Sequence, residues 1–209
     1  MTKEGDILNI EDKIVLSFDI CSSTAILEDL HRTESIEAWR DFLIWIKKYL
    51  VSKSKELGFN LYKFTGDGWI ILFRYDCPGS VIVPFLEDFC KNFKKRFRHE
   101  IKVLLETPPD VIGVNFGMDR GKLVSFVMRD NTEYIGRAIN MACRLQSAIK
   151  DKDKKPAYKA LVTKPLYCHL KGDLSQYKCQ EVERTLRNIA SDKPVQCVKL
   201  NLLSRTRID

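Results

Sequence analysis

Two apolar runs flank a tetrapeptide that fits only a tight turn. The stretch "YKFTGDGWIILF" covers residues 62–73, and its two halves are separated by TGDG at 65–68. Glycine adopts backbone conformations that other residues resist, and apolar runs on both sides of a glycine-rich turn are typical of a β-hairpin. The segment therefore predicts two paired strands with the carboxylate of Asp67 at their tip.

The segments before and after this hairpin alternate between strand and helix patterns. Residues 13–20 form an apolar run, which predicts a buried strand. Apolar residues then recur at helical spacing over much of 24–57, and Gly58 is placed to end that helix. A further helix is expected over 80–98.

The second half of the chain continues this alternation. Residues 111–118 and 122–128 predict two antiparallel strands, and 136–150 has a helical period. A lysine-rich loop, a short helix after Thr163 and two late strands follow. The pattern predicts an α+β fold with helices packed against a sheet, formed as one domain over residues 1–209.

Composition limits the partners and the compartment. The 209 residues are 44% hydrophobic, enough for a proper core, and their formal net charge of +7 favours an anionic partner. Much of the positive charge lies in two solvated runs, 91–102 and 150–159, so nucleic acid is not the expected partner. Seven cysteines without a CxxC pair, and no run of membrane-spanning length, predict a cytoplasmic protein with reduced thiols.

Two carboxylates occupy positions that suggest chemistry. Asp19 ends the first predicted strand, and the polar turn of Ser22, Ser23 and Thr24 opens a helix after it. Unpaired N–H groups at a helix start suit a phosphate chain. If the first strand pairs with the hairpin, Asp19 and Asp67 meet at one sheet edge and can hold Mg²⁺ or Mn²⁺. The structural alternatives are a helix cap for Asp19 and ordinary turn chemistry for Asp67.

Three blocks together resemble the class III nucleotidyl cyclases, which include bacterial and animal adenylate and guanylate cyclases. They are "FDICSST" at 18–24, "YKFTGDGWIILF" at 62–73 and "EYIGRAINMACRL" at 133–145, within a motif core over 13–150. The resemblance implies a ferredoxin-like βαββαβ core with extra C-terminal strands and helices packed on a mostly antiparallel sheet. It also implies a phosphorus–oxygen lyase that makes a 3′,5′-cyclic nucleotide and pyrophosphate from a nucleoside triphosphate.

The resemblance implies the catalytic roles of five positions. Asp19 and Asp67 would bind two divalent metal ions, Mn²⁺ or Mg²⁺, with the carbonyl of Ile20 as an extra ligand. Asn140 would orient the ribose, and Arg144 would stabilise charge on the α-phosphoryl group. Their spacing of four residues puts both on one helix face, for which a solvated surface is the alternative interpretation.

The resemblance also implies which residues read the base. Lys63 and Glu133 stand at the base-reading positions of adenylate cyclases. Glu133 is longer than the Asp or Thr that is common there, so it would reach further into the base-binding pocket. The shallower pocket that results favours a smaller base. Tyr62 is the residue expected to narrow the site against purines. An ordinary strand residue is the alternative for Lys63 and for Tyr62.

The expected triphosphate contacts match the family less well. Met118 stands where many cyclases have an arginine, and Arg120 is the nearest substitute. Near the C-terminus, Arg187 would replace a lysine that contacts the triphosphate, although a solvated surface arginine fits as well. The helix start at Ser22, Ser23 and Thr24 would complete the substrate contacts.

A closer resemblance is to the stand-alone pyrimidine cyclases of bacterial Pycsar anti-phage systems. Those enzymes make cyclic UMP or cyclic CMP, which a separate effector protein senses. The substrate predicted first is therefore UTP, then CTP, then ATP. Since this one chain carries both the metal-binding and the base-reading residues, the resemblance implies a head-to-tail homodimer with shared active sites.

Two rival functions come from other classes. One is a catalytically silent cyclase-like module that binds a nucleotide or a partner protein. The other is a polymerase-like or diguanylate-cyclase enzyme, whose sheet also uses two carboxylates. The absence of a GG[DE]EF-type hairpin and the presence of "GRAINMACR" at 136–144 argue against the latter.

Overall fold

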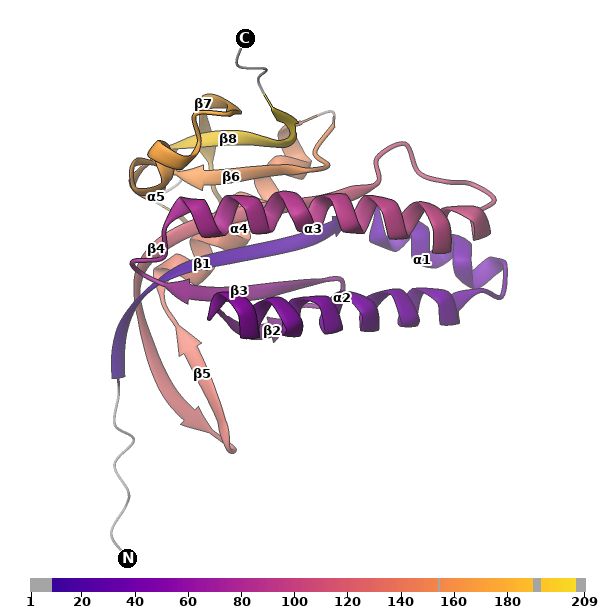
Figure 1. The fold of residues 1–209 in the computed structure, drawn as a ribbon, viewed down its shortest axis with the longest axis horizontal. Coiled ribbons are helices and arrows are strands. Elements are labelled where there is room, and N and C mark those ends of the chain that lie inside the picture. Colours follow the sequence, from indigo (N-terminus) through magenta and orange to yellow (C-terminus); the bar gives the residue numbers. More distant parts are fainter. Residues whose placement is uncertain (1–8, 154, 190–192, 206–209) are drawn as a thin grey trace, which may run out of the picture.

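A mixed sheet flanked by helices carries most of the predicted site residues (Figure 1). The computed structural model describes residues 9–153, 155–189 and 193–205. Its strands are β1 (Asn9–Cys21), β2 (Asn60–Phe64), β3 (Gly68–Arg74), β4 (Gly113–Met128), β5 (Asn131–Ile135), β6 (Lys159–Thr163), β7 (Tyr177–Thr185) and β8 (Pro194–Arg205). Its helices are α1 (Ser23–Arg32), α2 (Ile36–Leu57), α3 (Gly79–Glu100), α4 (Arg137–Lys152) and α5 (Lys164–Leu170).

The strand order is β2-β3-β1-β4-β6-β8-β7, and β5 pairs with β4 outside this path. Strand β1 runs antiparallel to both β3 and β4, whereas β6 runs parallel to β4. The first four strands of this order, with α2 and α3 as their connections, form the ferredoxin-like βαββαβ core. The later strands extend the sheet beyond β4, which confirms the expected α+β architecture.

The two faces of β1 contact different helices, because successive side chains of a strand alternate between faces. Leu16 and Phe18 belong to the larger core cluster, which includes the apolar residues of α2 and α3. Val15 packs instead with Ala138 and Ala142 of α4. Figure 1 shows α2 and α3 lying along one face of the sheet. The sheet is thus covered on both faces.

One sequence prediction is wrong in this region. Residues 111–118 and 122–128 were expected to form a hairpin, but they belong to a single strand, β4, of 16 residues. The residues between them, 119–121, resemble a turn in sequence but pair with β1 in unbroken register. The chain reverses later, at Arg129 and Asp130, whose φ angles are 49° and 65°.

The helix boundaries and the late segments agree better with expectation. The helix predicted over 24–57 is divided into α1 and α2, and Gly58, with φ 71°, ends α2 as predicted. Strand β6 lies where a lysine-rich loop was expected. All seven cysteines are free thiols, and three of them, Cys21, Cys90 and Cys197, are buried. None of the helices described here is both long and apolar enough to cross a membrane.

Candidate functional site

The register of three strands brings the predicted carboxylates to one end of the sheet. Asp19, near the end of β1, pairs with Gly68 of β3 and with Asn115 of β4. Asp67 directly precedes Gly68, so the tip of the β2–β3 hairpin lies beside Asp19. The close approach requires glycine, since a Cβ on Gly68 would lie 1.9 Å from the carbonyl oxygen of Phe18.

The turn into α1 lies against this hairpin tip. Ser22 has a left-handed backbone, with φ 59°, and its hydroxyl donates to the carbonyl of Val111 at 2.8 Å. The hydroxyl of Ser23 donates a hydrogen bond to Oδ2 of Asp67, and Thr24 is exposed. In the part of the chain that the structure describes, no side chain caps the start of α1. Its first N–H groups are therefore suited to bind phosphate oxygens.

The donor atoms at this end of the sheet are oxygens. They comprise the carboxylates of Asp19 and Asp67, the hydroxyl of Ser23 and the main-chain carbonyl of Ile20, which neighbours Asp19. Carboxylate, hydroxyl and carbonyl oxygens fit hard cations such as Mg²⁺ and Mn²⁺. The described residues contain no cluster of three or more His, Cys, Asp or Glu side chains suited to a metal, so an ion here would rest on two carboxylates.

A second group of predicted residues meets across the β2 and β5 strands. Nζ of Lys63 lies 3.2 Å from Oε2 of Glu133, 70 residues away in the chain. The hydroxyl of Tyr62 donates to the same Oε2 at 2.6 Å and accepts from the N–H of Tyr134 at 3.0 Å. The hydrogen bond from Tyr62, followed by that from Lys63, lowers the pKa of Glu133. The bond to Glu133 in turn raises the pKa of Lys63, so both groups are charged at neutral pH.

The residues predicted to act on the ribose and the α-phosphoryl group lie on α4. Asn140 and Arg144 are both exposed there, four positions apart on one side of the helix. Gln146, two residues after Arg144, is buried instead and turns toward the sheet. An exposed position is what a residue needs if it serves the site of a second copy.

One predicted phosphate-binding residue, Arg120, lies away from the carboxylates along the sheet. Arg120 pairs with Ile14 in the middle of the sheet, and its guanidinium lies 3.8 Å from the ring centre of Tyr75. Arg120 is therefore not brought to Asp19 within one chain. Arg187 is exposed between β7 and β8.

Sequence reasoning missed two buried polar residues beside Asp19. Asn115 lies within the apolar pattern of β4 and is 0% exposed. Gln146 lies within α4 and is 7% exposed. Nε2 of Gln146 donates to Oδ1 of Asn115 at 2.7 Å and to Oδ2 of Asp19 at 3.3 Å. An asparagine inside an otherwise apolar strand was the only sequence signal for this network.

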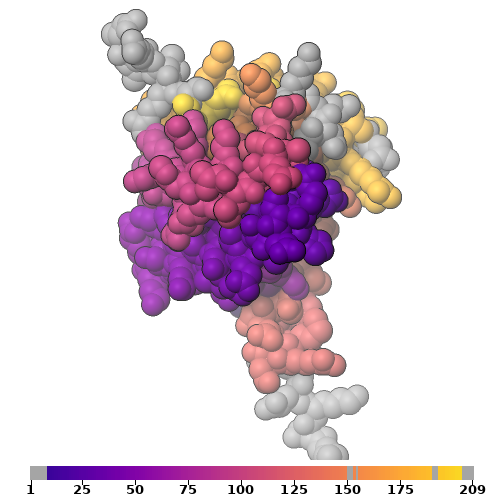
Figure 2. All heavy atoms as spheres, turned by 90° about the vertical axis from the view of Figure 1, so that its right-hand side faces the viewer, coloured from indigo at the N-terminus to yellow at the C-terminus, as the bar shows by residue number. Residues whose placement is uncertain are grey.

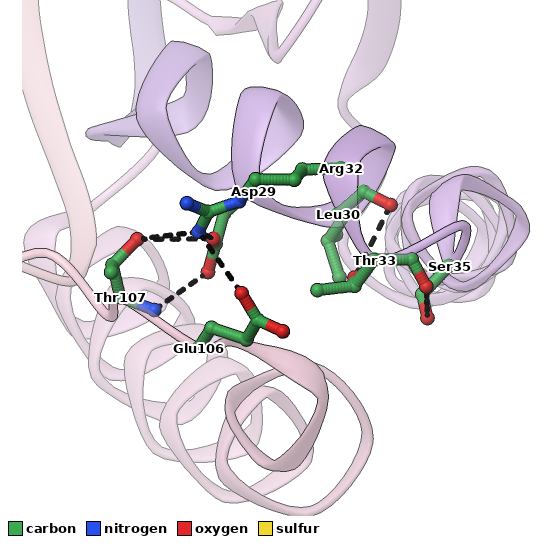
Figure 3. A network of polar contacts seen from close by, with 7 residues as sticks. All are labelled: Asp29, Leu30, Arg32, Thr33, Ser35, Glu106 and Thr107. Carbon is green, nitrogen blue, oxygen red and sulfur yellow. Dashed lines mark hydrogen bonds and ion pairs between the residues drawn. The ribbon is translucent and has the colours of Figure 1, made fainter.

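Another network, shown in Figure 3, attaches the loop before β4 to α1. The buried carboxylate of Asp29 accepts from the N–H and the hydroxyl of Thr107, both at 3.0 Å, and from Arg32. Arg32 also lies 3.5 Å from Glu106. The hydrogen bond from the Thr107 N–H is the main cause that lowers the pKa of Asp29. This network, together with the hydrogen bond from the Ser22 hydroxyl to the Val111 carbonyl, fixes the loop before β4 along α1.

The fold closely matches solved structures of cyclases. The adenylyl cyclase CyaB from P. aeruginosa superposes with a TM-score of 0.72 at 19% identity, over 96% of this chain and 97% of that chain. The guanylyl cyclase Cya2 gives a TM-score of 0.67 at 13% identity, over 92% and 93%. An adenylate cyclase from Trypanosoma brucei in its monomeric state gives 0.67 at 17% identity, over 94% and 91%.

These similarities lie in structure rather than in overall sequence. A bacterial light-regulated adenylyl cyclase also matches the whole of this chain, with a TM-score of 0.69 at 14% identity, but over only 57% of its own length. No protein-family model matches the sequence, and no curated protein matches it significantly. The chain therefore has the fold of class III nucleotidyl cyclase catalytic domains, as the resemblance implied.

Proposed function

We propose that the chain is a nucleotidyl cyclase that converts UTP into 3′,5′-cyclic UMP and pyrophosphate. The observation that carries this proposal is the pairing of Asp19 with Gly68, which puts the carboxylates of Asp19 and Asp67 at one end of the sheet. The uncapped start of α1 lies beside them and suits a triphosphate.

Asp19 and Asp67 would hold two divalent ions, Mn²⁺ or Mg²⁺, with the Ile20 carbonyl as a further ligand. Divalent ions bound there would lower the pKa of the ribose 3′-hydroxyl and neutralise negative charge on the phosphates. The chain's own part is to fix the ligands: Ser23 donates to Asp67 and restrains its carboxylate. The N–H groups at the start of α1 would bind the phosphate oxygens and orient the α-phosphorus for in-line attack.

The site would be completed by a second copy of the chain. Asn140 and Arg144 are exposed on α4, so they would orient the ribose and stabilise the α-phosphoryl charge in the partner's site. The β4–β5 hairpin projects from the body in Figure 1, and Figure 2 shows it from the side. Its Val127, Met128 and Ile135 are more than half exposed, which supports burial against another chain.

The base would be read by Lys63 and Glu133. A charged donor beside a charged acceptor complements a base edge with the same alternation, which uracil, cytosine and adenine all offer and which guanine presents as well, through O6 beside N1–H. The hydrogen bond from Tyr62 restrains the long carboxylate of Glu133, which would oppose its movement to admit a larger base. A long carboxylate at this position would leave less room for the base, which favours pyrimidines, and we rank UTP first, CTP second and ATP third.

The resemblance to Pycsar cyclases supports a biological role for this activity. Cyclic UMP would be a second messenger made in anti-phage defence, and a separate effector protein would sense it. The remaining candidate, a silent nucleotide-binding module, would keep the fold without turnover.

The test is to incubate the purified protein with Mn²⁺ and each of the four nucleoside triphosphates and to identify the products by mass spectrometry. We expect cyclic UMP as the main product. Cyclic AMP as the dominant product would overturn the assignment of a pyrimidine substrate but would leave the assignment of cyclase activity intact. Binding of a nucleotide without any cyclic product would favour the silent module.

A further inference from the structure

We propose that Gln146 is a positioning residue that holds Asp19 in the orientation required to bind a divalent cation. The inference rests on the proposed function, since it assigns Asp19 to a metal. Gln146 lies on α4, two residues after Arg144, and its side chain is directed inward rather than to solvent.

The side-chain amide of Gln146 makes polar contacts with two strands, and the contact with Asn115 is fully buried. Its Nε2 donates to Asn115 Oδ1 at 2.7 Å and to Asp19 Oδ2 at 3.3 Å. A primary amide carries two N–H protons, so a single group supplies both hydrogen bonds. The acceptor Asn115 is fully buried and is the register partner of Asp19 on the neighbouring strand. The amide therefore connects the side chains of two adjacent strands at the site.

A glycine lets the helix come close enough for these contacts. A Cβ on Gly117 would lie 2.0 Å from the carbonyl oxygen of Ala142 and 2.4 Å from the backbone nitrogen of Gln146. The backbone of α4 thus rests directly on β4 at this position, and no other residue would allow it. Gly117 and Asn115 lie on the same face of β4. The close contact between the α4 backbone and Gly117 therefore places the Gln146 side chain against Asn115.

The chemistry of an amide suits a residue that supports a metal ligand. Gln146 restrains the Asp19 carboxylate without neutralising it, whereas an ammonium or guanidinium there would compete with a cation for the same oxygens. Partners that hold ligands in this way contribute to metal affinity although they do not touch the metal.

The same helix would also join the two sites of the proposed dimer. Asn140 and Arg144 are exposed on α4 and would serve the partner's site, while Gln146 contacts Asp19 of its own chain. A displacement of α4 would therefore affect a metal ligand in one site and the α-phosphoryl contact in the other.

The test compares Gln146→Met, which keeps the length of the side chain but removes the donor, with the matched control Gln180→Met on the exposed surface of β7. Mn²⁺ binding is measured by electron paramagnetic resonance in the presence of a non-cyclisable UTP analogue, and urea denaturation verifies that each variant is folded. We expect Gln146→Met to weaken Mn²⁺ binding about 10- to 100-fold and the control to leave it unchanged. Activity at saturating Mn²⁺ should largely return, since the defect lies in metal affinity.

Equal Mn²⁺ affinity in wild type and folded Gln146→Met would overturn the inference while the proposed function stands. Absence of Mn²⁺ binding by the wild-type protein would overturn both. If Gln146→Met does not fold, the side-chain amide of Gln146 in the wild-type protein provides the measurement by ¹⁵N NMR. It should exchange slowly with solvent and shift when Mg²⁺ and the analogue are added, and an amide resonance that does not respond would contradict the proposal.

Discussion

Asp19 of β1 and Gly68 of β3 are register partners, and their pairing brings Asp67 to the same end of the sheet. The strands approach closely because Gly68 has no side chain to meet the Phe18 carbonyl, 1.9 Å from where a Cβ would lie. The position of one metal-binding candidate relative to the other thus depends on a single glycine.

The variant Gly68→Ala should therefore be destabilised and inactive. We expect the free energy of unfolding to fall by about 1–3 kcal/mol, because β3 must move away from β1 to relieve the contact. Urea denaturation measures this change. The matched control is Gly172→Ala, where an added Cβ meets nothing within 4 Å. An unchanged unfolding midpoint in Gly68→Ala would show that the strands do not approach as described.

Removal of the negative charge on Glu133 should impair recognition of the base. In Glu133→Gln the ion pair with Lys63 is lost, and we expect kcat/KM for UTP to fall about 10- to 100-fold with no change in fold. Steady-state kinetics with UTP, CTP and ATP provide the measurement. As a control, Asp76→Asn removes the carboxylate of the exposed pair with Arg74 and should leave the kinetics unchanged. Wild-type kinetics in Glu133→Gln would exclude this residue from base reading.

The two halves of each active site should be separable by mutation. The variants Asp67→Ala and Arg144→Ala are each expected to be inactive, because every site in either homodimer lacks one component. Mixing them should restore about one quarter of wild-type activity, since half of randomly mixed dimers are heterodimers and each contains one intact site. No recovery in samples that demonstrably contain heterodimers would argue against shared sites.

A buried carboxylate outside the site should limit stability at neutral pH. Asp119 is 3% exposed; its Oδ1 accepts from Thr163 at 2.6 Å, but Oδ2 has no hydrogen bond within the described chain and lies 3.8 Å from Arg137. Burial raises the pKa of Asp119 above its ordinary value of 3.8. Ionisation therefore costs stability above the raised pKa, and the cost fades as the pH falls toward 3.8.

The variant Asp119→Asn should remove that cost. We expect the free energy of unfolding at pH 7.5 to rise by roughly 1–3 kcal/mol, the usual penalty for a buried polar group without a partner, and the gain to shrink at pH 4.5. Urea denaturation at the two pH values measures it. If Asp119→Asn instead loses stability at pH 7.5, the charge of Asp119 in the wild-type protein must be compensated by more than its contacts with Thr163 and Arg137.

Local patterns in the sequence predict the carboxylate end of the site but not its support. The meeting of Asp19 and Asp67 follows from a strand end and a hairpin tip, both of which have short-range signals. The roles of Asn115 and Gln146 depend on how closely α4 approaches β4 at Gly117, which is a tertiary property with no local signal. For this reason these two residues could not be placed beside Asp19 from sequence.

The same limit explains the error in β4. A glycine next to charged residues at 119–121 is typical of a turn, but the register with β1 continues through it. Long-range pairing outweighs a weak turn signal when the neighbouring strand is buried. The contact of Lys63 with Glu133, which the resemblance implied, likewise depends on the true reversal at Arg129 and Asp130.

The most direct measurement of the central claim is mass spectrometry of the products that the wild-type protein and Asp19→Ala form from UTP with Mn²⁺. If cyclisation occurs at the Asp19 end of the sheet, wild type yields cyclic UMP and pyrophosphate in equal amounts, EDTA stops the reaction, and Asp19→Ala yields neither product while remaining folded. Cyclic UMP from Asp19→Ala at the wild-type rate, or no cyclic nucleotide from any nucleoside triphosphate with wild type, would contradict the claim.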